Sequence, residues 1–213
     1  LVEKQFSGKY NQVEEKPELL NYNSGDKKIP YYVVKEFKGK DLVGIQYEQL
    51  LQYALPNDNP EHAFRVISGD FVTTEDGTGI VHTAPTFGAD DALVAKQATP
   101  EVPPLLVKDD NDNLVPLVDL QGRFRPEVKD DLYGFAGEYV KSEYLNEEEE
   151  LVELAKQQDR LKSVIAELKK YLSVDERLAL KLNNENKAFK VEKYKHSYPN
   201  CWRTDKPILY YPL

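Results

Sequence analysis

One stretch of sixteen residues, 76–91, constrains the fold of this chain more than any other. It reads DGTGIVHTAPTFGADD. Asp76-Gly77 predicts a turn, because glycine adopts positive φ without a steric penalty. Ile80-Val81 is β-branched and predicts the end of a buried strand. The chain must therefore turn, run briefly as a strand and reach His82 at the end of that strand.

The second half of this stretch predicts a loop that leads into a short helix. Pro85 and Gly88 interrupt regular structure. Asp90 and Asp91 then precede an apolar run, and acidic residues are favoured in a first helical turn by the unpaired N–H groups and the helix dipole. A strand end, a loop and a helix start commonly form the wall of a pocket, so His82 and Asp91 are candidate functional residues.

Composition favours β-structure with many turns. The chain has 213 residues, 40% of them hydrophobic, and can bury a core as one large domain or two small ones. Fourteen tyrosines and eight phenylalanines accompany 13 prolines and 11 glycines. The net charge of −9 argues against non-specific binding of DNA or RNA by the whole surface.

The single cysteine, Cys201, excludes an internal disulfide and fits a reducing compartment. No apolar run approaches the eighteen or so residues that a membrane span needs. We therefore expect a cytoplasmic protein with no membrane partner. The chain contains no methionine and starts without a signal-peptide pattern, so we also expect a piece of a longer protein.

Two helices are predicted in the C-terminal half. Residues 147–172 carry apolar side chains at i, i+3 and i+4 spacing. Ser173 and Glu176 predict a capping box for a second helix over 174–182. The other expected elements are a strand over 31–37, a meander of strands over 63–67, 70–74 and 79–83, a helix over 90–98, a hairpin over 105–118 with an acidic tip, and a strand over 189–193.

The side chains at the candidate site suit binding of a cation and proton transfer. A carboxylate such as that of Asp91 can hold an ammonium group through a charge-assisted hydrogen bond. The imidazole of His82 can act as acid or base, or bond to a hydroxyl. Neither a dinucleotide fingerprint nor a phosphate-binding loop is present, and the acidic run 109–113 lacks the glycine and distal glutamate of a calcium loop. These residues predict no metal site and define no specific reaction.

Residues 77–91 closely resemble the editing-domain signature of the isoleucyl-tRNA synthetases. Residues 38–44, 65–72 and 196–207 are similar to further segments of the same family. The related valyl and leucyl enzymes share the Gly-Thr-Gly of residues 77–79 but usually carry other residues where His82 and Phe87 stand. The resemblance is therefore specific to the isoleucyl family.

The resemblance implies a β-rich α+β fold, a β-barrel-like editing domain with peripheral α-helices. Residues 1–213 are then a single, partial editing domain of a class I synthetase. Within it, 100–186 is a helix-containing insertion and 196–213 is the return strand toward the aminoacylation core of the same polypeptide.

The implied activity is post-transfer editing, the hydrolysis of valine wrongly esterified to isoleucine tRNA. One methylene gives a binding pocket only about 1–3 kcal/mol of discrimination, and isoleucyl-tRNA synthetase is itself the standard example, so a second sieve is needed. The partner is the 3′ end of that tRNA carrying the wrong amino acid, and DNA is not a partner. No cofactor is implied in this domain, whereas the full-length enzyme uses ATP and Mg²⁺ as a ligase.

By motif position, Asp91 binds the α-ammonium of the misacylated residue and His82 lies near the terminal ribose. These two are the implied catalytic residues. The implied substrate-binding residues are Thr78, Thr83, Phe87 and Asp90.

The threonine-rich segment that forms the other wall of the family's pocket is not found in this sequence, so we expect the isolated chain to deacylate tRNA poorly or not at all. Two alternatives stay open. One is a valyl-type domain that hydrolyses Thr-tRNA. The other is a non-catalytic tRNA-docking module that uses the basic stretch 187–206, with Lys193 and Lys195 as contacts.

Overall fold

The computed structural model describes residues 2–6, 8–73, 75, 77–193 and 197–211. Four of the expectations above involve residues outside this set: the turn at Asp76, the strand end at Thr74, the contact at Lys195, and the return segment at both of its ends, His196 and 212–213. Among the described residues, no helix has the length and apolar character needed to cross a membrane.

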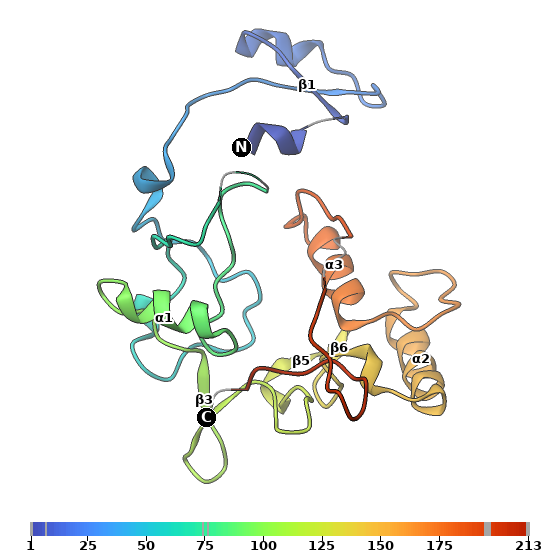
Figure 1. Ribbon diagram of the computed structural model, residues 1–213. Coiled ribbons are helices and arrows are strands. Elements are labelled where there is room, and N and C mark those ends of the chain that lie inside the picture. The colour runs from blue at the N-terminus through green and yellow to red at the C-terminus, as the bar shows by residue number, and fades with distance from the viewer. Residues whose placement is uncertain (1, 7, 74, 76, 194–196, 212–213) are drawn as a thin grey trace.

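Three separate two-stranded sheets and three α-helices make up the regular structure of the described residues. An α+β fold fits these elements, but the described strands do not close into a barrel. Figure 1 shows α1 (Ala89–Gln97) on the opposite side of the molecule from α2 (Glu147–Leu161) and α3 (Val174–Asn184). The 3₁₀ helices are η1 (Val2–Phe6), η2 (Lys16–Asn21), η3 (Gly39–Leu42), η4 (Pro60–His62), η5 (Pro126–Val128) and η6 (Ser142–Tyr144).

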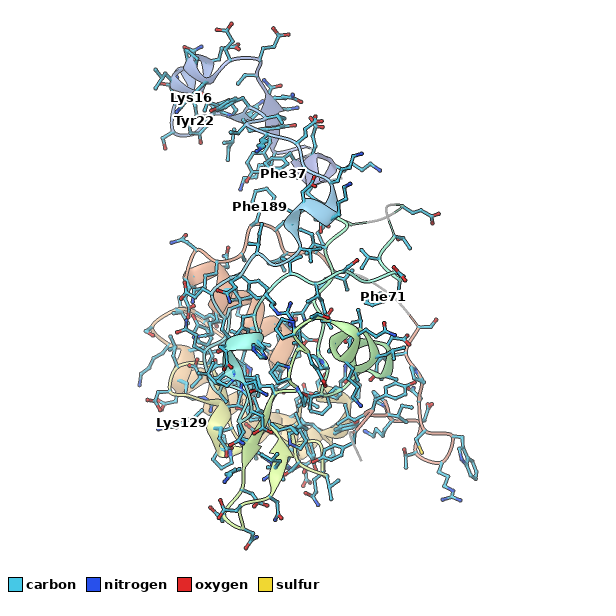
Figure 2. All side chains as sticks on the ribbon, turned by 90° about the vertical axis from the view of Figure 1, so that its left-hand side faces the viewer. Lys16, Tyr22, Phe37, Phe71, Lys129 and Phe189 are labelled. Atoms are coloured by element: carbon cyan, nitrogen blue, oxygen red, sulfur yellow. The ribbon has the colours of Figure 1, made fainter. Side chains whose placement is uncertain are left out.

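The N-terminal residues form a small lobe around two parallel strands. β1 (Tyr10–Gln12) pairs with β2 (Ile29–Tyr31), with Tyr10 opposite Ile29. Figure 2 shows Lys16 and Tyr22 at the far end of this lobe, and Phe37 and Phe189 where the lobe meets the rest of the chain.

An aromatic cluster joins this lobe to the C-terminal half. The ring of Phe6 stacks on Tyr31 at 4.5 Å and contacts Phe189 at 5.1 Å, and Tyr10 stacks on Phe189 at 5.5 Å. Phe189 was expected in a strand over 189–193, and that prediction is wrong. The N–H groups of Lys187 and Ala188 both bond the carbonyl of Leu182, which closes the end of α3, and residues 189–193 pair with no strand among the described residues.

The predicted strand meander over residues 63–83 is wrong. Pairing among its described residues is limited to an isolated bridge between Gln46 and Arg65, with flanking backbone bonds that join residues 64 and 66 to residues 44–47. Of the strand expected over 31–37, only Tyr31 lies in a strand, as the last residue of β2. A strand needs a partner and a buried face. Beyond Tyr31 and these few bonds, the described residues of the two segments have no strand partner, and large apolar side chains here are exposed, among them Val33, Val34, Phe37, Phe71, Ile80 and Val81.

The helix and hairpin predicted in the middle of the chain are confirmed. α1 starts after Gly88 and carries Asp90 and Asp91 in its first turn. β3 (Leu106–Lys108) and β4 (Leu114–Pro116) pair antiparallel. Their acidic tip is a turn, because the carboxylate of Asp109 accepts the N–H groups of Asn111 and Asn113, both at 2.9 Å.

The predicted capping box is confirmed, but the helix before it is shorter than predicted. Ser173 and Glu176 cap α3 reciprocally. The prediction of helix over 162–172 is wrong, because α2 ends at Leu161. Gln157 is fully buried, and its amide bonds both the N–H and the C=O of Leu172 at 2.9 Å. This side chain holds the segment after α2 folded back against the helix.

The core lies between α2, α3 and a third short sheet. β5 (Lys129–Asp130) pairs with β6 (Gly134–Phe135), antiparallel. Each large apolar side chain buried here contributes about 1.5–3 kcal/mol. The core cluster consists of Val128, Tyr133, Phe135, Leu161 and Val174.

A buried ionic network sits at the centre of this core. Arg177 is fully buried and bonds both carboxylate oxygens of Glu138 and the carbonyl of Tyr133. Arg160 bonds the same carboxylate at 2.8 Å. Gly134 makes room for it, since a Cβ there would lie 2.5 Å from Oε1 of Glu138. One carboxylate therefore joins α2 and α3 to the turn after β6.

The acid sensitivity of this network follows from the pKa of Glu138. Burial raises that pKa, but the hydrogen bonds and charges of Arg177 and Arg160 outweigh burial and hold it below its ordinary value. A lowered folded-state pKa contributes stability that is present above the ordinary pKa of about 4.3 and is lost as pH falls through the folded-state pKa. The urea midpoint of the wild type should therefore fall more steeply between about pH 5 and pH 3 than that of Glu138→Gln. Identical pH profiles would contradict this.

The C-terminal segment returns to the middle of the chain. The hydroxyl of Tyr144 donates to the carbonyl of Pro207 at 2.6 Å. Asn200 and Pro207 form an isolated antiparallel β-bridge. The ring of Tyr211 packs edge-to-face against the ring of Phe87, which lies in the candidate site. In Figure 1 this segment runs below α3, past β5 and β6, toward β3.

Candidate functional site

The candidate site is the loop 84–88 together with the first turn of α1. Asp91 is half-buried there, and its Oδ2 accepts the backbone N–H of Ala84 at 3.0 Å. Its Oδ1 has no protein partner among the described residues. One carboxylate oxygen is thus fixed by the loop and the other is free to accept a donor from a ligand.

Backbone bonds give the loop a defined shape. The N–H of Phe87 bonds the carbonyl of Ala84 at 3.1 Å, and the N–H of Ala92 bonds the carbonyl of Gly88 at 2.8 Å. The first bond closes a turn and the second starts the helix. The same turn that presents the N–H of Ala84 therefore leads directly into the helix that carries Asp91.

Thr86 anchors this loop to the segment that precedes β3. Its side chain is buried, and its hydroxyl accepts the N–H of Leu105 at 3.0 Å and lies 3.4 Å from the carbonyl of the same residue. No local sequence pattern singles out Thr86, Ala84 or the contact at Gly88. A threonine in a loop is ordinary, and the partner at Leu105 is distant in sequence.

The other predicted site residues lie along the chain before and within this loop. His82 and Asp90 are exposed, and among the described residues His82 has no hydrogen bond or ion pair. Thr83 and Phe87 are half-buried within the loop region. The hydroxyl of Thr78 bonds the backbone N–H and C=O of Ile80, so it stabilises its own turn.

The face around residues 78–91 is open and apolar. Ile80 is 58% exposed and Leu93 is 55% exposed, so large aliphatic residues lie uncovered on both sides of the loop in sequence. Ile80 and Val81 were expected at a buried strand end, and this prediction is wrong. Two hollows in the described residues lie elsewhere, one between α3 and residues 188–191 and one in the N-terminal lobe.

The described residues contain no group of three or more histidine, cysteine, aspartate or glutamate side chains that could hold a metal ion. The basic stretch 187–206 is partly neutralised by its neighbours. Lys187 pairs with Glu185 at 2.9 Å and Lys190 with Glu192 at 2.8 Å.

No family model matches the chain. It is 56% identical to an isoleucine–tRNA ligase of Cytophaga hutchinsonii over 214 residues, which are 100% of this chain and 18% of that protein. An isoleucine–tRNA ligase of Bacteroides fragilis is 45% identical over 92% of this chain and 16% of its own length. One from Clostridium tetani is 37% identical over 85% of this chain and 13% of its own length. The chain thus spans less than a fifth of these curated relatives.

Proposed function

Because this chain belongs to the isoleucine–tRNA ligase family, in which it matches one segment, we propose that it is the editing segment of such a ligase. The proposed reaction is hydrolysis of valine esterified to isoleucine tRNA. The observation that carries the proposal is the Asp91 carboxylate, held by the N–H of Ala84 through one oxygen and free at the other. A fixed carboxylate with one free oxygen suits the α-ammonium of an aminoacyl ester.

The chemistry we propose uses water as the nucleophile. No serine or cysteine paired with a base lies at this site, and the bond to be broken joins the amino-acid carbonyl carbon to a ribose oxygen. Asp91 anchors the ammonium, so the carbonyl carbon is held at a fixed place for attack by an ordered water. His82 lies beside the ribose, where an imidazole can exchange a proton with a hydroxyl.

Thr78, Thr83, Phe87 and Asp90 are proposed to line the substrate-binding surface. Phe87 lies in the loop 84–88, which begins at Ala84, and Thr83 directly precedes this loop. Phe87 is further held by the ring of Tyr211, whose centroid lies 6.4 Å away. The partner is the 3′ end of isoleucine tRNA, and no cofactor is needed for an ester hydrolysis of this kind. ATP and Mg²⁺ belong to aminoacylation elsewhere in the ligase, which we place in the cytoplasm.

We further propose that the apolar residues exposed along 33–93 become buried in the whole ligase, where a β-barrel-like domain forms. Strands need partners, and the described residues offer these segments almost none. In this arrangement 1–213 is one partial editing domain, 100–186 is its helical insertion and 196–213 returns to the aminoacylation core. The open face around Asp91 is then closed by another part of the ligase.

The test compares the full-length ligase with the 213-residue chain on three charged tRNAs. We expect the full-length ligase to hydrolyse Val-tRNA(Ile) much faster than Ile-tRNA(Ile). We expect the 213-residue chain to hydrolyse both poorly, because the face around its Asp91 is open. Faster hydrolysis of Thr-tRNA than of Val-tRNA would instead identify valyl-type specificity. Rapid hydrolysis of Val-tRNA(Ile) by the 213-residue chain would contradict the role given to the second wall.

A non-catalytic tRNA-docking module is the weaker alternative. Its basis is the basic stretch 187–206, and two of those lysines already have acidic partners. Under that reading, a change at Lys193 weakens tRNA binding and a change at Asp91 leaves hydrolysis intact.

A further inference from the structure

We propose that Gly88 and Thr86 are positioning residues that fix the Asp91 carboxylate. This inference rests on the proposed editing function. Neither residue is placed in contact with the substrate. Gly88 acts by leaving space for the carboxylate, and Thr86 acts by holding the loop whose backbone N–H binds it.

Space, and not backbone freedom, explains the glycine at position 88. Its backbone is extended, with φ −124° and ψ 130°, a conformation open to any residue. A Cβ built there would lie 2.8 Å from Oδ2, 3.0 Å from Cγ and 3.1 Å from Cβ of Asp91. Its three nearest atoms all belong to Asp91, so a methyl group at position 88 fits only if the Asp91 side chain shifts, and we expect that shift to weaken its bond to the N–H of Ala84.

Thr86 supplies the second constraint, on the loop itself. Its buried hydroxyl bonds the backbone of Leu105, in the segment just before β3. Valine has nearly the same shape but no hydroxyl, so it leaves two backbone groups of Leu105 without this partner. The loop is then free to shift, and the N–H of Ala84 shifts with it.

This positioning affects catalysis because it sets the direction in which the free oxygen of Asp91, Oδ1, faces. With Oδ2 tied to Ala84, rotation of the carboxylate is restricted and Oδ1 is presented in one direction. A charge held in place before the substrate arrives costs no reorganisation during the reaction. A displacement of about 1 Å at such a site lowers the rate on the order of a hundredfold.

The test uses the full-length ligase and the substitution Gly88→Ala. We expect kcat/KM for hydrolysis of Val-tRNA(Ile) to fall about ten- to a hundredfold, while synthesis of Ile-tRNA(Ile) and the unfolding temperature stay unchanged. Gly39→Ala is the matched control, because its Cβ meets nothing within 4 Å and its φ is not positive. Thr86→Val should lower hydrolysis and Thr86→Ser should retain it.

A double-mutant cycle separates positioning from general damage. In single-turnover assays at high enzyme concentration, Gly88→Ala should add nothing to Asp91→Ala, because no carboxylate remains to be displaced. An additive loss, or wild-type hydrolysis by Gly88→Ala while Asp91→Ala is impaired, would overturn this inference and leave the proposed function standing. Wild-type hydrolysis by Asp91→Ala would overturn both.

Discussion

Alanine in place of Asp91 in the full-length ligase is expected to cause Val-tRNA(Ile) to accumulate during aminoacylation with valine. The change removes the acceptor that we propose for the α-ammonium, a half-buried carboxylate. Loss of one member of such a charged pair costs about 2–5 kcal/mol, so the deacylation rate should fall roughly thirtyfold to several thousandfold. The measurement is hydrolysis of purified Val-tRNA(Ile), together with the charging plateau for valine.

Asp175→Ala provides the matched control for this variant. Asp175 is an exposed aspartate in the first turn of α3, as Asp91 is in the first turn of α1. The same substitution there removes a helix-start carboxylate without touching the loop 84–88, so editing should be unchanged. If Asp91→Ala accumulates no mischarged tRNA, the role given to its carboxylate is wrong.

The second large effect concerns stability. Leucine in place of Arg177 should lower the free energy of unfolding by about 3–5 kcal/mol, because among the described residues it leaves the buried Glu138 with Arg160 as its one charged partner. Arg177 also bonds the carbonyls of Tyr133 and Leu172, so three segments lose a common partner. Urea unfolding of the 213-residue chain, followed by far-ultraviolet circular dichroism, measures the change.

Two further variants test whether burial of the ion pair explains the large loss of stability expected for Arg177→Leu. Asp159 and Lys162 form an ion pair on the surface, 2.9 Å apart, so Asp159→Asn should shift the urea midpoint little. The double variant Glu138→Gln with Arg177→Leu should be less destabilised than the sum of its single changes, since neither charge is then left alone. An Arg177→Leu midpoint equal to that of the wild type would contradict the role given to the network.

The parts of the fold that the sequence predicts are those set by neighbours along the chain. The capping box at Ser173 and the start of α1 depend on groups within a few residues, and both form as expected. The end of α2 depends on Gln157, which binds Leu172 across the fold. The apolar periodicity continues past Leu161, so the pattern alone places the end of the helix too late.

The strands and the finer geometry of the site depend on distant partners. Residues 79–83 have a strand-like composition, yet composition does not provide a neighbouring strand or a covering layer. The helix start predicts where Asp91 lies, whereas the direction of its carboxylate depends on Ala84 and Gly88. Their loop is in turn held by Leu105, nineteen residues beyond Thr86. No local pattern reports such a contact.

The role that we propose for Asp91 depends on one chemical group of the substrate, the α-ammonium. An isoleucine tRNA esterified with 2-hydroxy-3-methylbutanoic acid keeps the side chain of valine but carries a hydroxyl in place of that group. The decisive measurement is single-turnover deacylation of both esters by the wild-type and Asp91→Ala ligases. We predict that the wild type prefers the valyl ester and that Asp91→Ala hydrolyses both esters at the same low rate. A loss of the same factor on both esters would show that Asp91 does not bind the ammonium.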